Sequence, residues 1–247
     1  VRAGISGLAS VESESDSLAE AIQRFAENAG QAALGNSGTI LAEYFRGLAT
    51  DLSATATSAD WHHGLSVASR FAFEAVSVPV SGTILTVAEA IASTKSQGDL
   101  QSLLVELRTV AKSELMATTS QLPQLASAGV VDAGALVLVL FHEVVSSYLN
   151  DHEVEISYAF SCSQNSQLDI YDGPDYELTF LLEIDDSARD SLAAGLAALG
   201  ESLTIIRTGQ QFKIHIHTDL TTEVLELAAN FGSVTSVTKT SLKALVD

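Results

Sequence analysis

Residues 202–217 read SLTIIRTGQQFKIHIH, and this stretch decides the fold of the second half of the chain. Two runs within it, 202–207 and 211–217, have the pattern that is typical of β-strands. The residues TGQ at 208–210 lie between the two runs and favour a tight turn. The stretch therefore predicts a β-hairpin.

The segments on either side of this hairpin alternate between strand and helix patterns. Their order is a strand at 177–184, a helix at 187–198, the hairpin, a helix at 221–230 and a strand at 233–239. The order β-α-β-β-α-β is that of a ferredoxin-like domain, in which two helices cover one face of a four-stranded sheet. We therefore expect an α+β domain over residues 175–247.

Residues 1–150 have a different pattern, which predicts an all-α domain. Apolar residues recur every three or four positions from residue 18, from residue 65 and from residue 100, as on one face of a helix. Segment 134–149 is apolar nearly all round, so we expect it to be the most buried helix. The polar residues at 151–174 are expected to form a linker between the two domains.

Composition excludes several classes of partner. The chain has 31 acidic and 12 basic residues and a formal net charge of −19, which disfavours nucleic acid and anionic membranes as partners. Its longest apolar run, ALVLVLF at 135–141, is far shorter than the roughly 20 residues of a membrane span. The single cysteine, Cys162, excludes an internal disulfide. Because the N-terminus also has no signal-peptide pattern, we expect the protein to be cytoplasmic.

Three glycine-containing turns stand at expected helix starts: LGNSGT at 34–39, PVSGTILTV at 79–87 and AGVVDAG at 128–134. Glycine lets the backbone approach a ligand closely, and the free N–H groups of a helix start favour an anion such as phosphate. The hydroxyls of Ser37, Thr39 and Thr83 would add donors. The same residue types are also ordinary helix caps, so one such turn alone would not indicate a ligand.

Taken together, these stretches resemble a known family. GNSGTIL at 35–41, PVSGTILTVAEA at 79–90 and LPQLASAGVVDAG at 122–134 resemble the dihydroxyacetone kinase L-domain family and, within it, the ATP-binding subunit of bacterial fatty acid kinase. FKIHIHTDLTTEVLELAANFGSV at 212–234 is similar to the middle domain of that subunit. The resemblance covers nearly the whole chain.

The resemblance implies both a fold and a reaction. The fold is an eight-helix antiparallel barrel that holds ATP or ADP with Mg²⁺ in its helix-linking loops, followed by the middle domain. The reaction transfers the γ-phosphoryl of ATP to a fatty acid carboxylate held by a separate fatty-acid-binding protein. The chain would then form a homodimer. The residues implied in nucleotide binding are Asn36, Ser37, Gly38, Thr39, Gly82, Thr83, Asp132, Ala133 and Gly134.

The sequence departs from the family at the magnesium site. The Asp-rich loop that holds the ions in the family would lie just before Val1, so we expect this sequence to be a fragment, with a natural degenerate relative as the alternative. The family's DAGG is DAGA here, with Ala135 at its end. The sequence stops at about the point where the family's C-terminal domain would start. Two other functions therefore stay open: a dihydroxyacetone-kinase-like subunit, and a non-catalytic scaffold.

His215 and His217 form a second candidate site. They lie two residues apart on an expected strand, so their side chains lie on one face of the sheet. An arbitrary pair of this kind is most often two half-exposed imidazoles. The resemblance, however, implies a metal site of one cysteine and two histidines, and Glu177 stands nearest to the position of the missing cysteine. The first and third strands of a ferredoxin-like sheet are antiparallel neighbours, so Glu177 and the end of the histidine strand can meet. Glutamate with two histidines is an acceptable Zn²⁺ ligand set, and Asp219 is an alternative third ligand.

Overall fold

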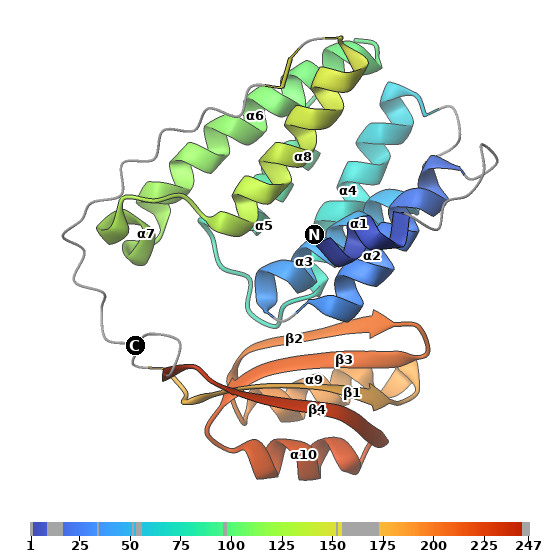
Figure 1. Cartoon of the computed structure of the whole chain (residues 1–247). Coiled ribbons are helices and arrows are strands. Elements are labelled where there is room, and N and C mark those ends of the chain that lie inside the picture. Colours follow the sequence, from blue (N-terminus) through green and yellow to red (C-terminus); the bar gives the residue numbers. More distant parts are fainter. Residues whose placement is uncertain are drawn as a thin grey trace.

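The computed structural model describes residues 2–8, 17–33, 35–50, 52, 56–95, 98–151, 153–154 and 173–243. A helical part lies on one side of a small four-stranded sheet (Figure 1). Cys162 and most of the expected 151–174 linker lie outside the described residues. No helix in the described part of the chain is both long and apolar enough to cross a membrane.

The described residues of the first part are helical, as the sequence predicts. The helices are α1 (Arg2–Leu8), α2 (Leu18–Ala32), α3 (Asn36–Ala49), α4 (Ser58–Glu74), α5 (Ile84–Ala92), α6 (Leu100–Gln121), α7 (Pro123–Ala128) and α8 (Ala133–Leu149). Polar residues before α2 and α4 define where these helices begin. Ser17 and Thr57 each accept a hydrogen bond from a backbone N–H three residues on, at Glu20 and Asp60. Those carboxylates accept the cap residue's own N–H in return, which satisfies donors that a helix start would leave open.

The core of the helical part surrounds α3, which packs against α2 and α4. Ten of its 14 residues are buried, against eight of 17 in α8. The expectation that the 134–149 helix is the most buried one is therefore wrong. Polar residues of α8, among them His142 and Glu143, occupy part of its buried face, while Val144 and Tyr148 are exposed. Hydrogen bonds and ion pairs to other helices make this arrangement possible.

The second part has the order of elements that the sequence predicts. It consists of β1 (Tyr176–Glu183), a 3₁₀ turn (Asp186–Ala188), α9 (Arg189–Ala197), β2 (Glu201–Thr208), β3 (Gln211–Thr218), α10 (Thr221–Ala229) and β4 (Ser233–Ser241). The strand order across the sheet is β2-β3-β1-β4, and every neighbouring pair is antiparallel. Alternate residues such as Phe180 and Ile214 are fully buried in a core that includes residues of α9 and α10.

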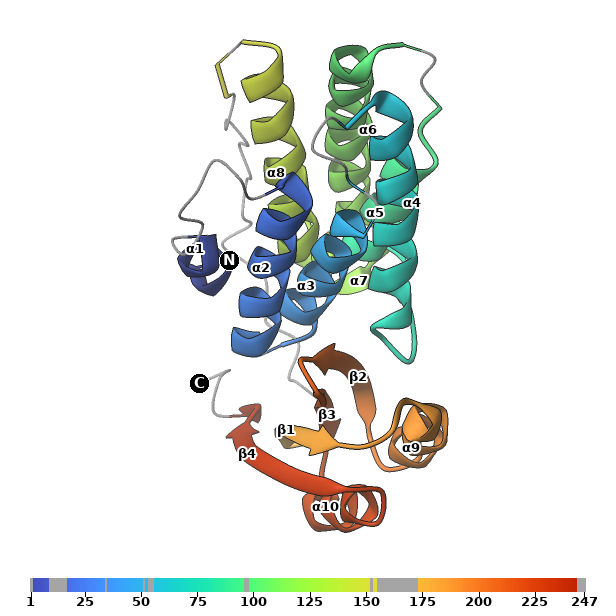
Figure 2. The same ribbon diagram turned by 90° about the vertical axis from the view of Figure 1, so that its right-hand side faces the viewer.

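The opposite face of the sheet is turned toward the helical part (Figure 2). Ile206 on β2 packs against α2, where a Cβ on Gly30 would lie 3.6 Å from its Cδ1. The backbone also joins the two parts: Val76, just after α4, forms an isolated antiparallel bridge with Thr204, and the Ser77 N–H donates to the Leu203 carbonyl over 3.0 Å. The sheet is thus docked on the ends of helices whose loops carry the expected nucleotide residues.

Candidate functional site

The N-terminal ends of α3, α5 and α8 meet at Asp132. This residue caps α8, because its Oδ1 accepts the Ala135 N–H over 2.7 Å. The backbone N–H groups of Gly134 and of Ile84, the first residue of α5, are also close enough to lower the pKa of the Asp132 carboxyl. Ser37 of α3 also lies beside Gly134. A Cβ on Gly134 would be 3.2 Å from Ser37 Oγ and 3.2 Å from Asp132 Oδ1. Segments far apart in sequence are thereby brought to one place.

Asp132 is held from both its backbone and its side chain. The Thr118 hydroxyl in α6 accepts the Asp132 N–H over 3.0 Å and donates to the Leu115 carbonyl over 2.6 Å. Burial raises the pKa of the Asp132 carboxyl, while the backbone donors act in the opposite direction. Asp132 is therefore a fixed, partly desolvated carboxylate whose negative charge is stabilised by backbone N–H dipoles.

The start of α3 differs from the starts of α5 and α8. Gly35 is its N-cap and offers no side-chain cap, so the N–H groups of Asn36, Ser37 and Gly38 have no intrahelical acceptor. Ser37 is exposed. The Asn36 Oδ1 is buried and has no hydrogen-bond partner within the described residues. This combination of open donors and an unsatisfied side chain is what a bound polar ligand would complete.

Other expected nucleotide residues have structural roles here. Thr39 is 3% exposed and lies inside the helical core, so its hydroxyl does not face the turn's surface. Gly82 has φ = +82°, and a Cβ there would lie 2.7 Å from Gln121 Cβ, so both its conformation and its packing require glycine. The Thr83 hydroxyl caps α5 at Leu85 N over 3.3 Å and donates to the Val80 carbonyl over 2.7 Å. Ala133 is exposed beside Asp132.

Glu177, His215 and His217 form a cluster on the sheet face that is turned toward the helices. Glu177 lies opposite His217 in the β1–β3 ladder, so the expectation that the first and third strands bring them together is confirmed. Their potential ligand atoms all lie within 4.8 Å of one another. Glu177 Oε1 is 3.9 Å from His215 Nδ1, and its Oε2 is 3.9 Å from His217 Nε2.

The surroundings of this cluster are half-desolvated. Burial raises the pKa of the Glu177 carboxyl. Burial also lowers the pKa of His217, although the Glu201 carboxylate opposes that shift. Glu201 lies opposite His217 on the other neighbouring strand, β2, and sequence reasoning missed it. Asp219, the alternative third ligand, is not in the cluster, because its Oδ1 accepts the Asp175 N–H over 2.7 Å beyond the end of the strand.

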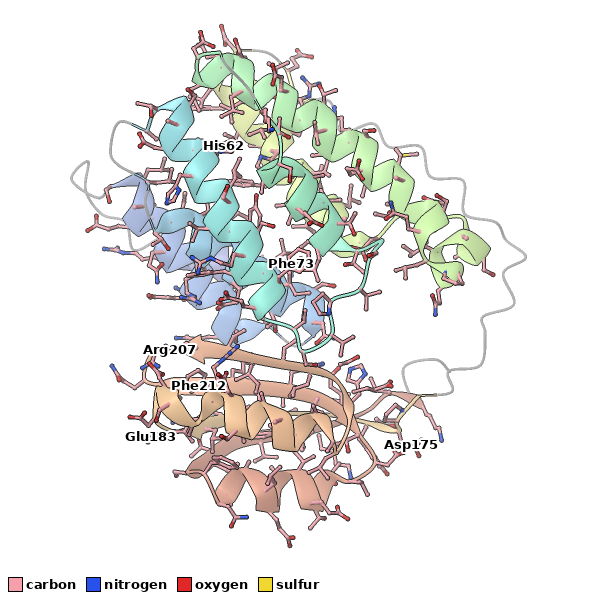
Figure 3. The ribbon with its side chains drawn as sticks, turned by 180° about the vertical axis from the view of Figure 1, so that it is seen from behind. His62, Phe73, Asp175, Glu183, Arg207 and Phe212 are labelled. Atoms are coloured by element: carbon pink, nitrogen blue, oxygen red, sulfur yellow. The ribbon has the colours of Figure 1, made fainter. Side chains whose placement is uncertain are left out.

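A separate cleft of ≈ 270 Å³ lies between the helical part and the sheet. Of its three arginines, Arg46 is paired with Glu43 and Arg207 with Asp186, while Arg189 lies 3.6 Å from Asp190 Oδ1. Figure 3 shows Arg207 beside Phe212 at this boundary. Since carboxylates of the chain already neutralise the guanidinium groups of Arg46 and Arg207, the cleft is a weaker candidate for a phosphate ligand than the start of α3.

Comparison with known families accounts for both parts of the chain. The model of the DAK2 domain matches residues 2–147. The chain belongs to the DAK2 domain family. The model of the FakA-like middle domain, which is named after fatty acid kinase, matches residues 173–245. Both families are kinase-related, so the resemblance inferred from the sequence motifs is confirmed.

Individual relatives of this DAK2 protein are distant and longer. Protein YloV of Bacillus subtilis (strain 168) is 27% identical over 231 residues, which cover 83% of this chain and 41% of the relative. The uncharacterized protein SH1689 of Staphylococcus haemolyticus is 27% identical over 256 residues, which cover 93% of this chain and 46% of the relative. The chain thus spans less than half the length of these relatives.

The DAK2 part also contains a buried polar network that sequence reasoning missed. His142 on α8 is 1% exposed, and its Nε2 shares a hydrogen bond of 3.1 Å with the Tyr44 hydroxyl on α3. Glu143, fully buried, pairs with Arg108 Nε at 2.7 Å and Lys112 Nζ at 2.6 Å. The sequence signal for this network was the polar pair His142 and Glu143 within the otherwise apolar segment 134–149.

Proposed function

We propose that this chain is the nucleotide-binding component of a fatty-acid-kinase-like enzyme. The observation that carries the proposal is the uncapped start of α3 beside Asp132 and Gly134. Backbone N–H groups of Asn36, Ser37 and Gly38 would bind the phosphates of ATP or ADP, and the Ser37 hydroxyl would add a fourth donor. This arrangement suits a protein of net charge −19, because backbone N–H dipoles would bind the anion without a cluster of basic side chains.

Phosphoryl transfer needs positioning and neutralisation of charge more than it needs a general base. Mg²⁺, when bound, would supply the neutralisation. The described residues would hold the phosphates still and orient the γ-phosphoryl outward. The carboxylate of a fatty acid would be the nucleophile, so we assign no catalytic base to this chain. A separate fatty-acid-binding protein would hold the acyl chain.

The same proposal takes α1–α8 as the described part of the barrel and the sheet as the ferredoxin-like domain that the resemblance implies. We also propose a cytoplasmic location and a homodimer. The middle-domain match favours the fatty acid kinase over a dihydroxyacetone-kinase-like subunit. A scaffold without activity is the remaining alternative.

We further propose Glu177, His215 and His217 as ligands of Zn²⁺. With bonds of about 2.1 Å, ligand atoms of a tetrahedral zinc site are about 3.4 Å apart. The two carboxylate–imidazole distances of 3.9 Å approach this spacing, so small side-chain rotations would complete three ligands. The Glu201 carboxylate, which raises the pKa of His217, would lie next to this zinc site.

The test of nucleotide binding is calorimetric titration of ATP with Mg²⁺ into the full-length protein. Ser37→Ala should weaken binding, since it removes a donor at the start of α3. Ser66→Ala is the matched control, because Ser66 is exposed on α4 and, within the described part of the chain, donates to the His62 carbonyl one turn back. Wild-type protein that binds no nucleotide would leave the scaffold interpretation. Phosphorylation of dihydroxyacetone, with no transfer to a fatty acid on its carrier protein, would favour the second enzyme.

A further inference from the structure

A buried lysine of the sheet completes the end of helix α2. Lys213 on β3 is 7% exposed, and its ammonium donates to the carbonyls of Gly30 over 3.1 Å and Gln31 over 2.8 Å. It also donates to the carbonyl of Ala33, the residue that follows the helix. The last carbonyls of a helix have no intrahelical donor, and a cation there also interacts favourably with the helix dipole. Lys213 therefore acts as a C-terminal cap supplied from the other part of the chain.

The capped residue lies directly before the candidate phosphate turn. Ala33 packs against Gly38, since a Cβ on Gly38 would lie 3.3 Å from Ala33 Cβ. Gly35, two residues after Ala33, accepts the Thr39 N–H over 3.2 Å and so begins α3. Holding the Ala33 carbonyl therefore restrains both ends of the turn that presents the open N–H groups.

Other contacts hold the two parts together without this lysine. Arg189 of α9 donates to the Glu74 carbonyl over 3.0 Å, and the backbone contacts of the segment after α4 lie on a different strand, β2. Removing the Lys213 ammonium should therefore loosen the end of α2 and leave the sheet docked. An effect on the turn can then be separated from an effect on docking.

We propose that Lys213 is a positioning residue for the nucleotide site: it holds Ala33 against the start of α3 so that the N–H groups of Asn36, Ser37 and Gly38 converge on phosphate. This inference rests on the proposed function of that turn. It assigns to the middle-domain part a role in nucleotide affinity, through a contact between residues 180 to 183 positions apart in sequence.

The test compares Lys213→Met with Lys239→Met in the full-length protein. Lys239 is the matched control, because its contacts among the described residues are with the sheet part: it donates to Thr221 Oγ1 over 3.2 Å and lies 3.5 Å from the Tyr176 ring centroid. If the turn of Lys213→Met is competent a tenth of the time, its apparent Kd for ADP with Mg²⁺ rises about tenfold. The Kd of Lys239→Met should equal that of wild type.

Hydrogen exchange supplies a readout that does not depend on nucleotide. The hydrogen-bonded amides of Ala33 and Thr39 should exchange faster in Lys213→Met, while those of β2 stay protected. Lys213→Arg, which keeps a charged donor, should recover part of the affinity. If Lys213→Met does not fold, Lys213→Gln, which keeps two donors, is judged by the same criteria.

Two results would overturn the inference: a wild-type Kd in Lys213→Met, or unchanged exchange of the Ala33 and Thr39 amides. Failure of the proposed function looks different. In that case neither wild type nor any variant binds nucleotide, or Ser37→Ala binds normally, and the exchange experiment still decides whether Lys213 orders the turn.

Discussion

The buried histidine of α8 should make the stability of this protein depend on pH. Burial lowers the pKa of His142 to about 3, so the imidazole is neutral in the folded protein at any pH above that value. In the unfolded chain its pKa is about 6.5. Between these values the unfolded state binds one proton more than the folded state. Stability is therefore fully present above pH 6.5 and falls by about 1.4 kcal/mol for each pH unit below it.

The protonation of His142 in the unfolded chain lowers the free energy of unfolding by about 2 kcal/mol between pH 7.5 and pH 5.0. His142→Gln removes it, because an amide does not titrate in this range and can still bond to the Tyr44 hydroxyl. At pH 7.5 the variant should be less stable than wild type by about 2 kcal/mol, for lost packing and an altered hydrogen bond. At pH 5.0 the two proteins should be nearly equal.

Urea unfolding followed by circular dichroism at both pH values measures the difference between the two proteins. Asp132 and Glu177, whose pKa values are raised, titrate equally in both and cancel. Burial raises the pKa of the neighbouring Glu143, but its bonds to Arg108 and Lys112 outweigh this and hold it below its ordinary range. A stability difference that is the same at both pH values would refute the reasoning, because it would mean that His142 is free to charge in the folded state.

Three further perturbations test the packing and the sites. Gly82→Ala should lower stability by about 2 kcal/mol through its positive φ and the clash with α6, and a thermal transition unchanged within error would contradict this. Glu143→Gln should cost about 3 kcal/mol in urea unfolding, because it leaves two cationic partners without their carboxylate; the exposed Glu106→Gln on α6 should cost almost nothing. Protein purified with zinc and dialysed should retain one equivalent by elemental analysis, and Glu177→Ala should retain at least about tenfold less. Equal zinc in both would argue against the assigned ligand set.

Local patterns predicted much of this protein correctly. The hairpin at 202–217, the order of strands and helices around it and the helical first part follow from periodicity, turn residues and caps, which act over a few residues. The proximity of Glu177 to the end of the third strand followed as well, because the first and third strands of such a sheet are antiparallel neighbours. The register that places Glu177 opposite His217 came from the structure.

Other features depended on contacts between distant residues. Periodicity identifies the apolar face of a helix, but it does not show which partners a buried polar group will find. His142 is buried because Tyr44, 98 positions earlier, meets its ring, and Glu143 because Arg108 lies 35 positions away. Lys213 would be an ordinary strand lysine if the sheet were not docked on the end of α2. Burying a polar or charged group is costly unless hydrogen bonds or opposite charges compensate it, and only the tertiary structure brought those partners within reach.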